Sequence, residues 1–162
     1  NPQDARKAAK QNRKALSSIN LGSAKKQKQL LPEGDAKTRY QSAFGYLRKR
    51  EFRKAELALK EFLTTHPDDP LVPNAMYWLG ETYYTRGKYE DAAEIFISGY
   101  EQHSESSKTP DNLLKLGLSL LKLERRADAC IAFAQLLSEF PNSSKSLIRR
   151  AINERKRHGC AA

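Results

Sequence analysis

An internal repeat of 37 residues constrains this chain more than any other feature of its sequence. When the sequence is shifted by 37 residues, Ala43 aligns with Gly80 and Gly117. The same shift aligns further sets of similar residues: Tyr46 with Tyr83 and Leu120, Ala55 with Ala92 and Ala129, and Leu59 with Phe96 and Phe133. Such a repeat is typical of proteins in which successive units stack and bury a continuous core.

Each unit is predicted to form two helices, because apolar residues recur at spacings of three and four. The expected helices cover residues 37–49, 52–65, 70–86, 89–102, 107–123, 126–139 and 144–157. Arg50, Gly87 and Glu124 fall at the turn between the two helices of their units. The repeated small residues let the paired helix backbones approach closely. Some positions depart from the pattern, and at one of them Phe52 and Tyr89 align with Arg126.

The starts of the helices are also predicted to repeat. Asp69, Ser106 and Ser143 lie 37 residues apart, and each suits an N-cap, whose side chain accepts a bond from a free N–H group of the first turn. Pro70 would then occupy the first helical position, where its missing donor costs little. The segment after Ser143 has a polar face and is expected to cap the stack.

These elements predict an all-α fold, a right-handed superhelix of three helix pairs with a C-terminal capping helix. The expected repeats cover about 37–69, 70–106 and 107–143, within a domain at 37–158, and the capping helix covers 144–157. Residues 1–36 are expected to form a basic flexible segment with at most a marginal helix over 4–16, and residues 159–162 a tail. No stretch approaches the roughly 20 apolar residues that a membrane span needs, so none is expected.

The net charge of +10 is concentrated at the two ends of the chain. Residues 1–39 carry +7, residues 40–146 carry −1, and residues 147–162 carry +4. A basic chain suggests an acidic partner such as nucleic acid or an anionic surface. The repeat region is nearly neutral, however, so the charge describes the ends.

Several motifs carry a resemblance to a known family. The arrangement of Leu79, Gly80, Tyr83, Gly87, Tyr89, Ala92 and Phe96 is similar to the tetratricopeptide repeat, as is that of Leu116, Gly117, Ala129, Phe133 and Pro141. The stretches PDDPLVPNAMYWLGETYYTRGKYEDAAEIF and SSKTPDNLLKLGLSLLKLERRADACIAF resemble the C-terminal domain of the periplasmic Tol–Pal-associated family called YbgF or CpoB. The resemblance covers residues 40–160. Residues 1–39 lack the heptads of the coiled coil that family members often carry.

The resemblance implies a periplasmic protein of Gram-negative bacteria that binds other proteins and is not an enzyme. Family members work with the Tol–Pal machinery, contact TolA, and help to coordinate peptidoglycan synthesis with outer-membrane constriction during cell division. It therefore implies TolA and the peptidoglycan synthesis machinery as partners, and it leaves the oligomeric state open.

No residue pattern points to catalysis. The chain has no HExxH, CxxC, GxSxG or phosphate-binding glycine-rich motif, so we expect no cofactor, metal or small-molecule substrate. His66 and His103 lie one repeat apart and need not converge on one ion. Cys130 is expected to be a small buried residue. Cys160 lies in the basic tail, as either a free thiol or part of an intermolecular disulfide.

A partner-binding groove is predicted on the first helices, because these line the concave side of stacked helix pairs. Helical spacing places ten residues there: Tyr40, Phe44, Leu47, Asn74, Tyr77, Glu81, Tyr84, Leu114, Leu118 and Leu121. The groove would be apolar and aromatic, with Glu81 placed to meet a Lys or Arg, and would suit a short segment with apolar anchors. Alternatively, several of these side chains pack between repeats or beneath the last helix.

A second hypothesis is a generic tetratricopeptide adaptor whose basic ends bind nucleic acid or anionic surfaces. The affinity of such a protein would fall steeply with salt. The chain has no recognised DNA- or RNA-binding motif, so nucleic acid is not the expected partner. Deleting residues 1–39 would separate the hypotheses, because groove binding should survive the deletion.

Overall fold

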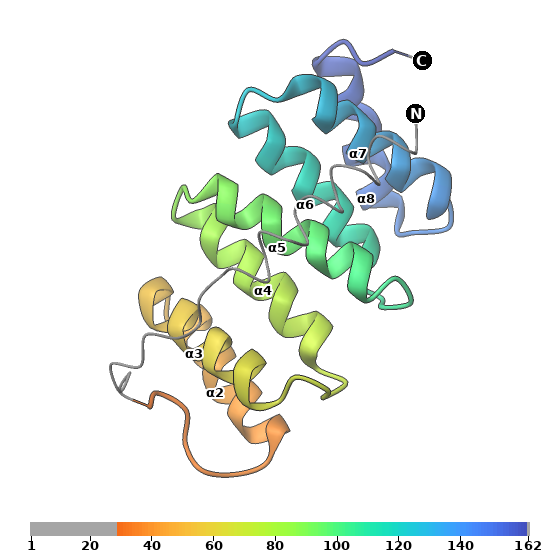
Figure 1. The fold of residues 1–162 in the computed structure, drawn as a ribbon. Helices are drawn as coiled ribbons and strands as arrows, with labels where there is room; N and C mark the ends of the chain where they lie inside the picture. The colour runs from red at the N-terminus through yellow and green to blue at the C-terminus, as the bar shows by residue number, and fades with distance from the viewer. Residues whose placement is uncertain (1–28, 162) are drawn as a thin grey trace.

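The structure, a computed structural model, describes residues 29–161, and every helix predicted within this range is present. The described helices are α2 (Ala36–Arg48), α3 (Phe52–Thr65), α4 (Val72–Thr85), α5 (Tyr89–Gln102), α6 (Thr109–Lys122), α7 (Arg126–Glu139) and α8 (Lys145–Arg157). Helix pairs stack from the orange α2–α3 pair to the blue α8 (Figure 1). The predicted all-α fold is therefore confirmed, while the expected helix over 4–16 lies outside the described residues.

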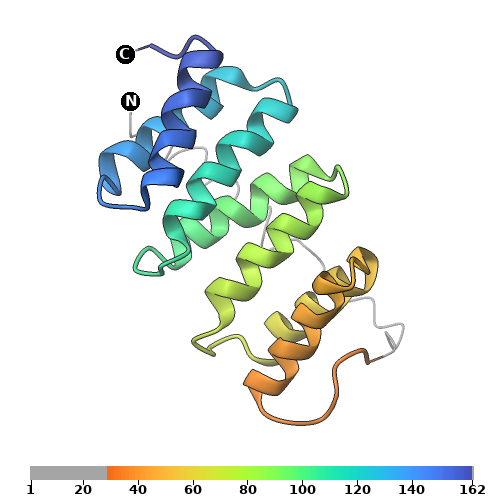
Figure 2. The ribbon, with the colours of Figure 1, turned by 180° about the vertical axis from the view of Figure 1, so that it is seen from behind.

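The first helices of the pairs form one face of the stack. Figure 2 shows α2, α4, α6 and α8 following one another on this face, and each contacts the next. The second helices α3, α5 and α7 form the other layer, and the apolar core lies between the layers. No helix between residues 29 and 161 combines the length and hydropathy that crossing a bilayer requires.

Close approach of the paired helices depends on one small residue in each first helix. A Cβ atom at Gly80 would lie 2.4 Å from the Phe96 ring, and one at Gly117 would lie 2.3 Å from the Phe133 ring. Both distances are far shorter than van der Waals contact, so only glycine fits opposite phenylalanine here. In the first unit the fully buried Ala43 takes this position, where the second helix carries leucine in place of phenylalanine.

The turns within the helix pairs share one backbone conformation. Arg50, Gly87 and Glu124 have φ values of 59°, 73° and 59°, which is the left-handed conformation that commonly ends helices. In each turn the next N–H group bonds back to a helix carbonyl: Glu51 to Tyr46, Lys88 to Tyr83, and Arg125 to Leu120, all at 2.9 Å. The three turn positions predicted from the repeat are therefore confirmed.

Two predicted helix starts are wrong by two residues, because the proposed caps close turns that precede the helices. The Asp69 carboxylate accepts a bond from the N–H of Leu71 at 2.8 Å. The Ser106 hydroxyl accepts one from the N–H of Lys108 at 3.1 Å. Both are local side-chain turns, after which α4 and α6 begin. Pro70 thus lies in a turn and not in the helix.

The start of α8 differs from its prediction by one residue. Ser144, and not Ser143, is the N-cap, and its hydroxyl accepts a bond from the N–H of Leu147 at 3.4 Å. The prolines at the starts of α4 and α6 are Pro73 and Pro110, within the first two helical positions, where a missing N–H leaves no bond unmade.

Leu30 and Leu31, which we expected to be flexible, pack on the first helix pair. The N–H groups of Leu30 and Leu31 donate to the Glu61 carboxylate at 2.9 and 3.3 Å. The Arg39 guanidinium binds the same carboxylate at 3.1 Å, and Leu31 is only 4% exposed. Glu61 thereby holds the chain over the open end of the stack. The remainder of the predicted flexible segment, up to residue 28, lies outside the described residues.

The C-terminal tail is tied to α7 by an intramolecular disulfide. Cys130 and Cys160 are bonded, with their Cα atoms 5.5 Å apart, so both expectations for the cysteines are wrong. Neither is a free thiol, and the bridge does not join two chains. Arg126 donates to the carbonyl oxygens of His158 and Gly159. This contact explains why the third repeat has an arginine where the others have an aromatic residue.

Helix α8 buries a carboxylate that two of its own arginines neutralise and the His158 ring also contacts. Glu154 is only 3% exposed. Its oxygens lie 2.9 Å from Arg150, 3.6 Å from Arg157 and 3.4 Å from the His158 ring. A buried unpaired carboxylate would be costly, so this cluster is what lets α8 carry an acidic residue on its buried face.

A second buried carboxylate joins the first two repeats. Glu56 on α3 is 6% exposed, and its oxygens contact Arg86, Lys60 at 3.1 Å and Lys88 at 3.4 Å. Burial acts to raise the pKa of Glu56, but the cations Lys60, Lys88 and Arg86 outweigh it and hold the pKa below its usual value. The ionised form is therefore stabilised by folding.

Candidate partner-binding groove

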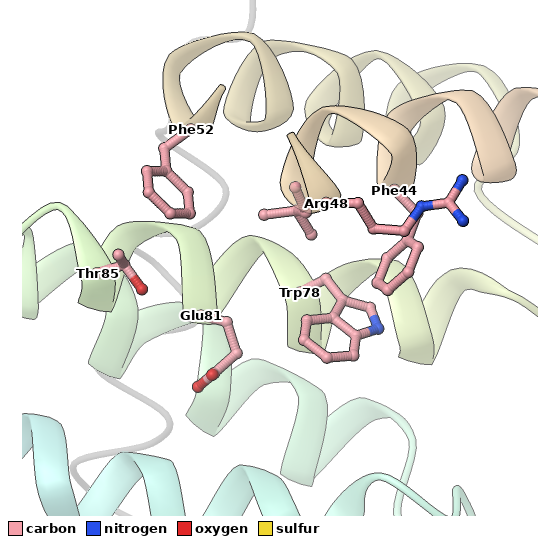
Figure 3. A pocket seen from close by; sticks show the side chains of 7 residues that line it. Phe44, Arg48, Phe52, Trp78, Glu81 and Thr85 are labelled. Atoms are coloured by element: carbon pink, nitrogen blue, oxygen red, sulfur yellow. The ribbon is translucent and has the colours of Figure 1, made fainter. Parts of the chain in front are cut away.

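A hollow of about 230 Å³ opens between α2 and α4 on the face of the first helices. Its lining is mostly apolar, with one cation and one carboxylate: Phe44, Leu47, Arg48, Phe52, Trp78, Glu81 and Thr85. Figure 3 labels six of these side chains, which come from α2, from α4 and, for Phe52, from the start of α3. Its size suits one bulky side chain of a partner.

Two aromatic rings form one wall of the hollow. Phe44 and Trp78 meet edge to face, with ring centroids 5.1 Å apart and an interplanar angle of 66°, an arrangement that aromatic pairs favour. The Arg48 guanidinium lies over the Phe44 ring at 5.8 Å from its centroid. Among the described residues Arg48 makes no ion pair, so it leaves an unopposed positive charge at the edge of the hollow.

Lysines from the α6 side cover the neighbouring aromatic rings. The ammonium group of Lys108 lies 4.8 Å from the Tyr77 ring centroid and 5.5 Å from that of Trp78. The ammonium group of Lys115 lies 4.8 Å from the Tyr84 ring centroid. Cations at these distances are attracted to the ring faces. The groove therefore presents positive charge over its aromatic residues and is less apolar than we expected.

Glu81 is already neutralised within the chain. Its carboxylate lies 2.8 Å from the Lys115 ammonium group, and each side chain is 22% exposed. We expected Glu81 to await a basic residue of a partner, but Lys115 from the next repeat supplies that charge. One further carboxylate lies nearby, Asp111, whose pKa burial raises against the opposing effect of Lys108 and Lys115.

Three of the ten predicted groove residues line the hollow, namely Phe44, Leu47 and Glu81. Tyr40 packs beside it, with its ring centroid 6.3 Å from that of Phe44, and burial raises the pKa of its hydroxyl. Tyr84 lies half-buried under Lys115, along the groove beyond the hollow.

Other predicted residues serve the core. Tyr77 is 9% exposed and packs against the rings of Trp78 and Phe96, and burial raises the pKa of its hydroxyl. Leu118 is 8% exposed. Leu114 and Leu121 are half-buried and also pack against the core.

Asn74 lies apart from the hollow. It lines a second, more polar depression together with Pro70, Pro73 and the loop at 102–107. Between residues 29 and 161 no group of three or more His, Cys, Asp or Glu side chains is placed to hold a metal ion.

Five residues of this region are absent from the predicted groove: Phe52, Trp78 and Thr85, which line the hollow, and Lys108 and Lys115, which lie over the aromatic rings. The sequence could have indicated Trp78 and Lys115. They lie 37 residues apart, and each comes directly after a predicted groove residue, Tyr77 or Leu114. A prediction that also took the residue after each groove position would have included Trp78 and Lys115. Lys108 precedes α6, so helical spacing alone could not have placed it.

Family models described as tetratricopeptide repeat match residues 40–106 and 111–143. Together they span more than half of the chain and include all three helix pairs. Two curated proteins named Cell division coordinator CpoB, from Pseudomonas putida and its strain KT2440, are 38% identical over 48 residues. The aligned part is 30% of this chain and only 18% of those proteins.

Solved structures share the fold at low sequence identity. The chain named MamA AMB-1 is 22% identical with a TM-score of 0.59, and the match covers 77% of this chain and 64% of that one. The N-terminal domain of stress-induced protein-1 from C. elegans is 14% identical with a TM-score of 0.62, covering 74% and 93% of the two chains. At these identities the likeness concerns the fold alone.

Proposed function

As a tetratricopeptide-repeat protein this chain is a protein-interaction module, and we propose that it acts with the Tol–Pal system in the periplasm. In this role it binds TolA or the peptidoglycan synthesis machinery and coordinates that synthesis with outer-membrane constriction during cell division. The proposal is supported by the 48-residue match to proteins named Cell division coordinator CpoB. The Cys130–Cys160 disulfide also supports it, because disulfides persist in oxidising compartments such as the periplasm.

The observation that carries the proposal is the hollow between α2 and α4. Its wall of Phe44 and Trp78 is an apolar surface on a face that no other part of residues 29–161 fills. Side chains of this kind, buried by a partner, typically supply much of the binding energy at protein interfaces. The hollow therefore receives a bulky apolar side chain of the partner segment.

The charges around the hollow specify the partner further. Glu81 is paired with Lys115, so the remaining charges are those of Arg48, which lines the hollow, and of Lys108, which lies over the Trp78 ring. A carboxylate on the partner, one or two residues from the apolar anchor, would pair with Arg48. The bound segment thus combines a large apolar residue with a neighbouring Asp or Glu.

Intrinsic fluorescence tests the proposal directly, because Trp78 is the single tryptophan of the chain. Titration with purified TolA should change the emission of Trp78 in a saturable manner. Phe44→Ala should weaken binding at least tenfold, since truncating a central aromatic anchor costs about 2 kcal/mol or more and each step of about 1.4 kcal/mol is a factor of ten. Arg48→Gln should weaken it less and reduce its dependence on salt.

Ile131→Ala is the matched control, because Ile131 is an apolar residue of α7, 47% exposed and outside the groove. It should bind TolA like the wild type. If Phe44→Ala and Ile131→Ala bind equally well, the groove is not the binding site. If the wild type fails to bind TolA at all, the Tol–Pal assignment is wrong.

A further inference from the structure

A stripe of four exposed side chains runs along α8. Lys145, Arg149, Ile152 and Lys156 are spaced by four, three and four residues, so they lie in line on one face of the helix. Ile152 is 38% exposed. The three cations of this stripe make no side-chain hydrogen bond or ion pair with any residue between 29 and 161.

The stripe points away from the rest of the protein. The buried residues of α8 are Leu147, Ala151 and Glu154, and a helix of 3.6 residues per turn places them on the side opposite to the stripe. They face α6 and α7, the two helices that α8 contacts. Because α8 is the last helix of the stack (Figure 1), the stripe forms the end face of the molecule.

This end face is held rigid at both ends of the helix. Ser144 caps the start of α8. At the other end the disulfide from Cys160 to Cys130 and the contacts of Arg126 with the tail fix the last turn. The cations are therefore presented on a preformed surface, so docking need not pay for ordering the helix.

We propose that the α8 stripe docks the protein on a membrane surface rich in anionic phospholipid. Three unpaired cations on one line match the negative charge of the lipid phosphates. Ile152 lies in the same line and can enter the boundary between headgroups and acyl chains, as apolar residues of surface-lying helices do. The membrane accounts for both the cations and the exposed isoleucine.

Other occupants fit this face less well. A soluble polyanion would pair with the cations but would leave Ile152 in water. A second copy of the chain, docked through the same face, would bring six like charges together, which is unfavourable. The inference does not depend on the groove or on the identity of the protein that binds there.

Vesicle cosedimentation with the full chain tests the proposal, using phosphatidylglycerol vesicles against phosphatidylcholine vesicles. Each Lys or Arg near an anionic membrane contributes about fivefold to partitioning. The triple variant Lys145→Gln, Arg149→Gln, Lys156→Gln should therefore partition about 100-fold more weakly to phosphatidylglycerol. Ile152→Ser should weaken partitioning to vesicles severalfold and leave binding to a short DNA duplex unchanged.

The control variant removes three exposed cations from the other end of the stack, with Lys37→Gln, Lys49→Gln and Arg53→Gln. It has the same net charge as the α8 variant and should partition nearly like the wild type. Equal losses in the two triple variants would show a response to net charge alone and overturn the proposal. The proposal would also be overturned if the wild type bound phosphatidylglycerol vesicles no better than phosphatidylcholine vesicles, or if Ile152→Ser partitioned like the wild type.

Discussion

The disulfide between Cys130 and Cys160 should contribute a large share of the stability of the C-terminal end. It closes a loop of 30 residues. In the chain-entropy model, constraining the unfolded chain with such a loop stabilises the folded state by about 3.6 kcal/mol. For a fold of this size, with an unfolding entropy near 2.1 cal/mol/K per residue, the loss corresponds to about 13 °C in Tm.

Thermal unfolding followed by circular dichroism measures this contribution. Cys160→Ser should lower Tm by about 13 °C. Adding a reductant to the wild type should produce the same shift. Reductant added to Cys160→Ser is the control and should change nothing, because no bridge remains to be broken.

Hydrogen exchange should locate the effect. Helix α8 packs mainly on α6 and α7, so without the bridge its amides should exchange much faster while those of α2–α5 stay protected. A Tm shift below about 3 °C, or faster exchange spread evenly over all helices, would refute the view that the bridge holds α8 on the stack.

Three further substitutions test the packing. Gly117→Ala should cost about 3 kcal/mol in urea unfolding, because its methyl group would overlap the Phe133 ring. Glu124→Gly should raise the free energy of unfolding by about 0.5–1 kcal/mol, because glycine adopts the left-handed turn conformation without strain. Glu56→Gln should cost about 3 kcal/mol at pH 7, since three cations lose their carboxylate. The pKa of Glu56 is lowered by folding from its usual 4.5, so its contribution is present above that pH. The free energies of unfolding of the wild type and of Glu56→Gln should therefore converge as the pH of the urea titration is lowered below 4.5.

The repeat allowed the helices and their turns to be predicted from sequence. Each unit contains the same apolar spacing, and the turn positions Arg50, Gly87 and Glu124 follow from it even though two of them are not glycine. The helix starts were harder, because Asp69 and Ser106 are good caps in isolation. The turns that these residues close depend on bonds to Leu71 and Lys108, which spacing does not reveal.

For the groove, the sequence predicted which residues share a face of one helix, but not which residues of the next helix contact them. Spacing identifies which residues share a face of α4, but not what α6 places over them. Lys115 neutralises Glu81 and covers Tyr84 from the next repeat, and Tyr77 becomes part of the core because Phe96 packs against it. The pairing of Cys130 with Cys160 likewise depends on how the tail folds back over α7.

The turn that follows α8 has a consequence for the length of the array. Gly159 has φ of 61°, and the N–H of Cys160 bonds to the carbonyl of Arg155 at 2.9 Å, as in the three turns within the repeats. Counting seven residues back from those earlier turns leads to the small residues of the first helices, Gly117 among them. The same count from Gly159 leads to Ile152. A helix packed on α8 in the way that α7 packs on α6 would meet the Ile152 side chain where the repeats have glycine or alanine, so this one position limits how closely another helix can approach α8.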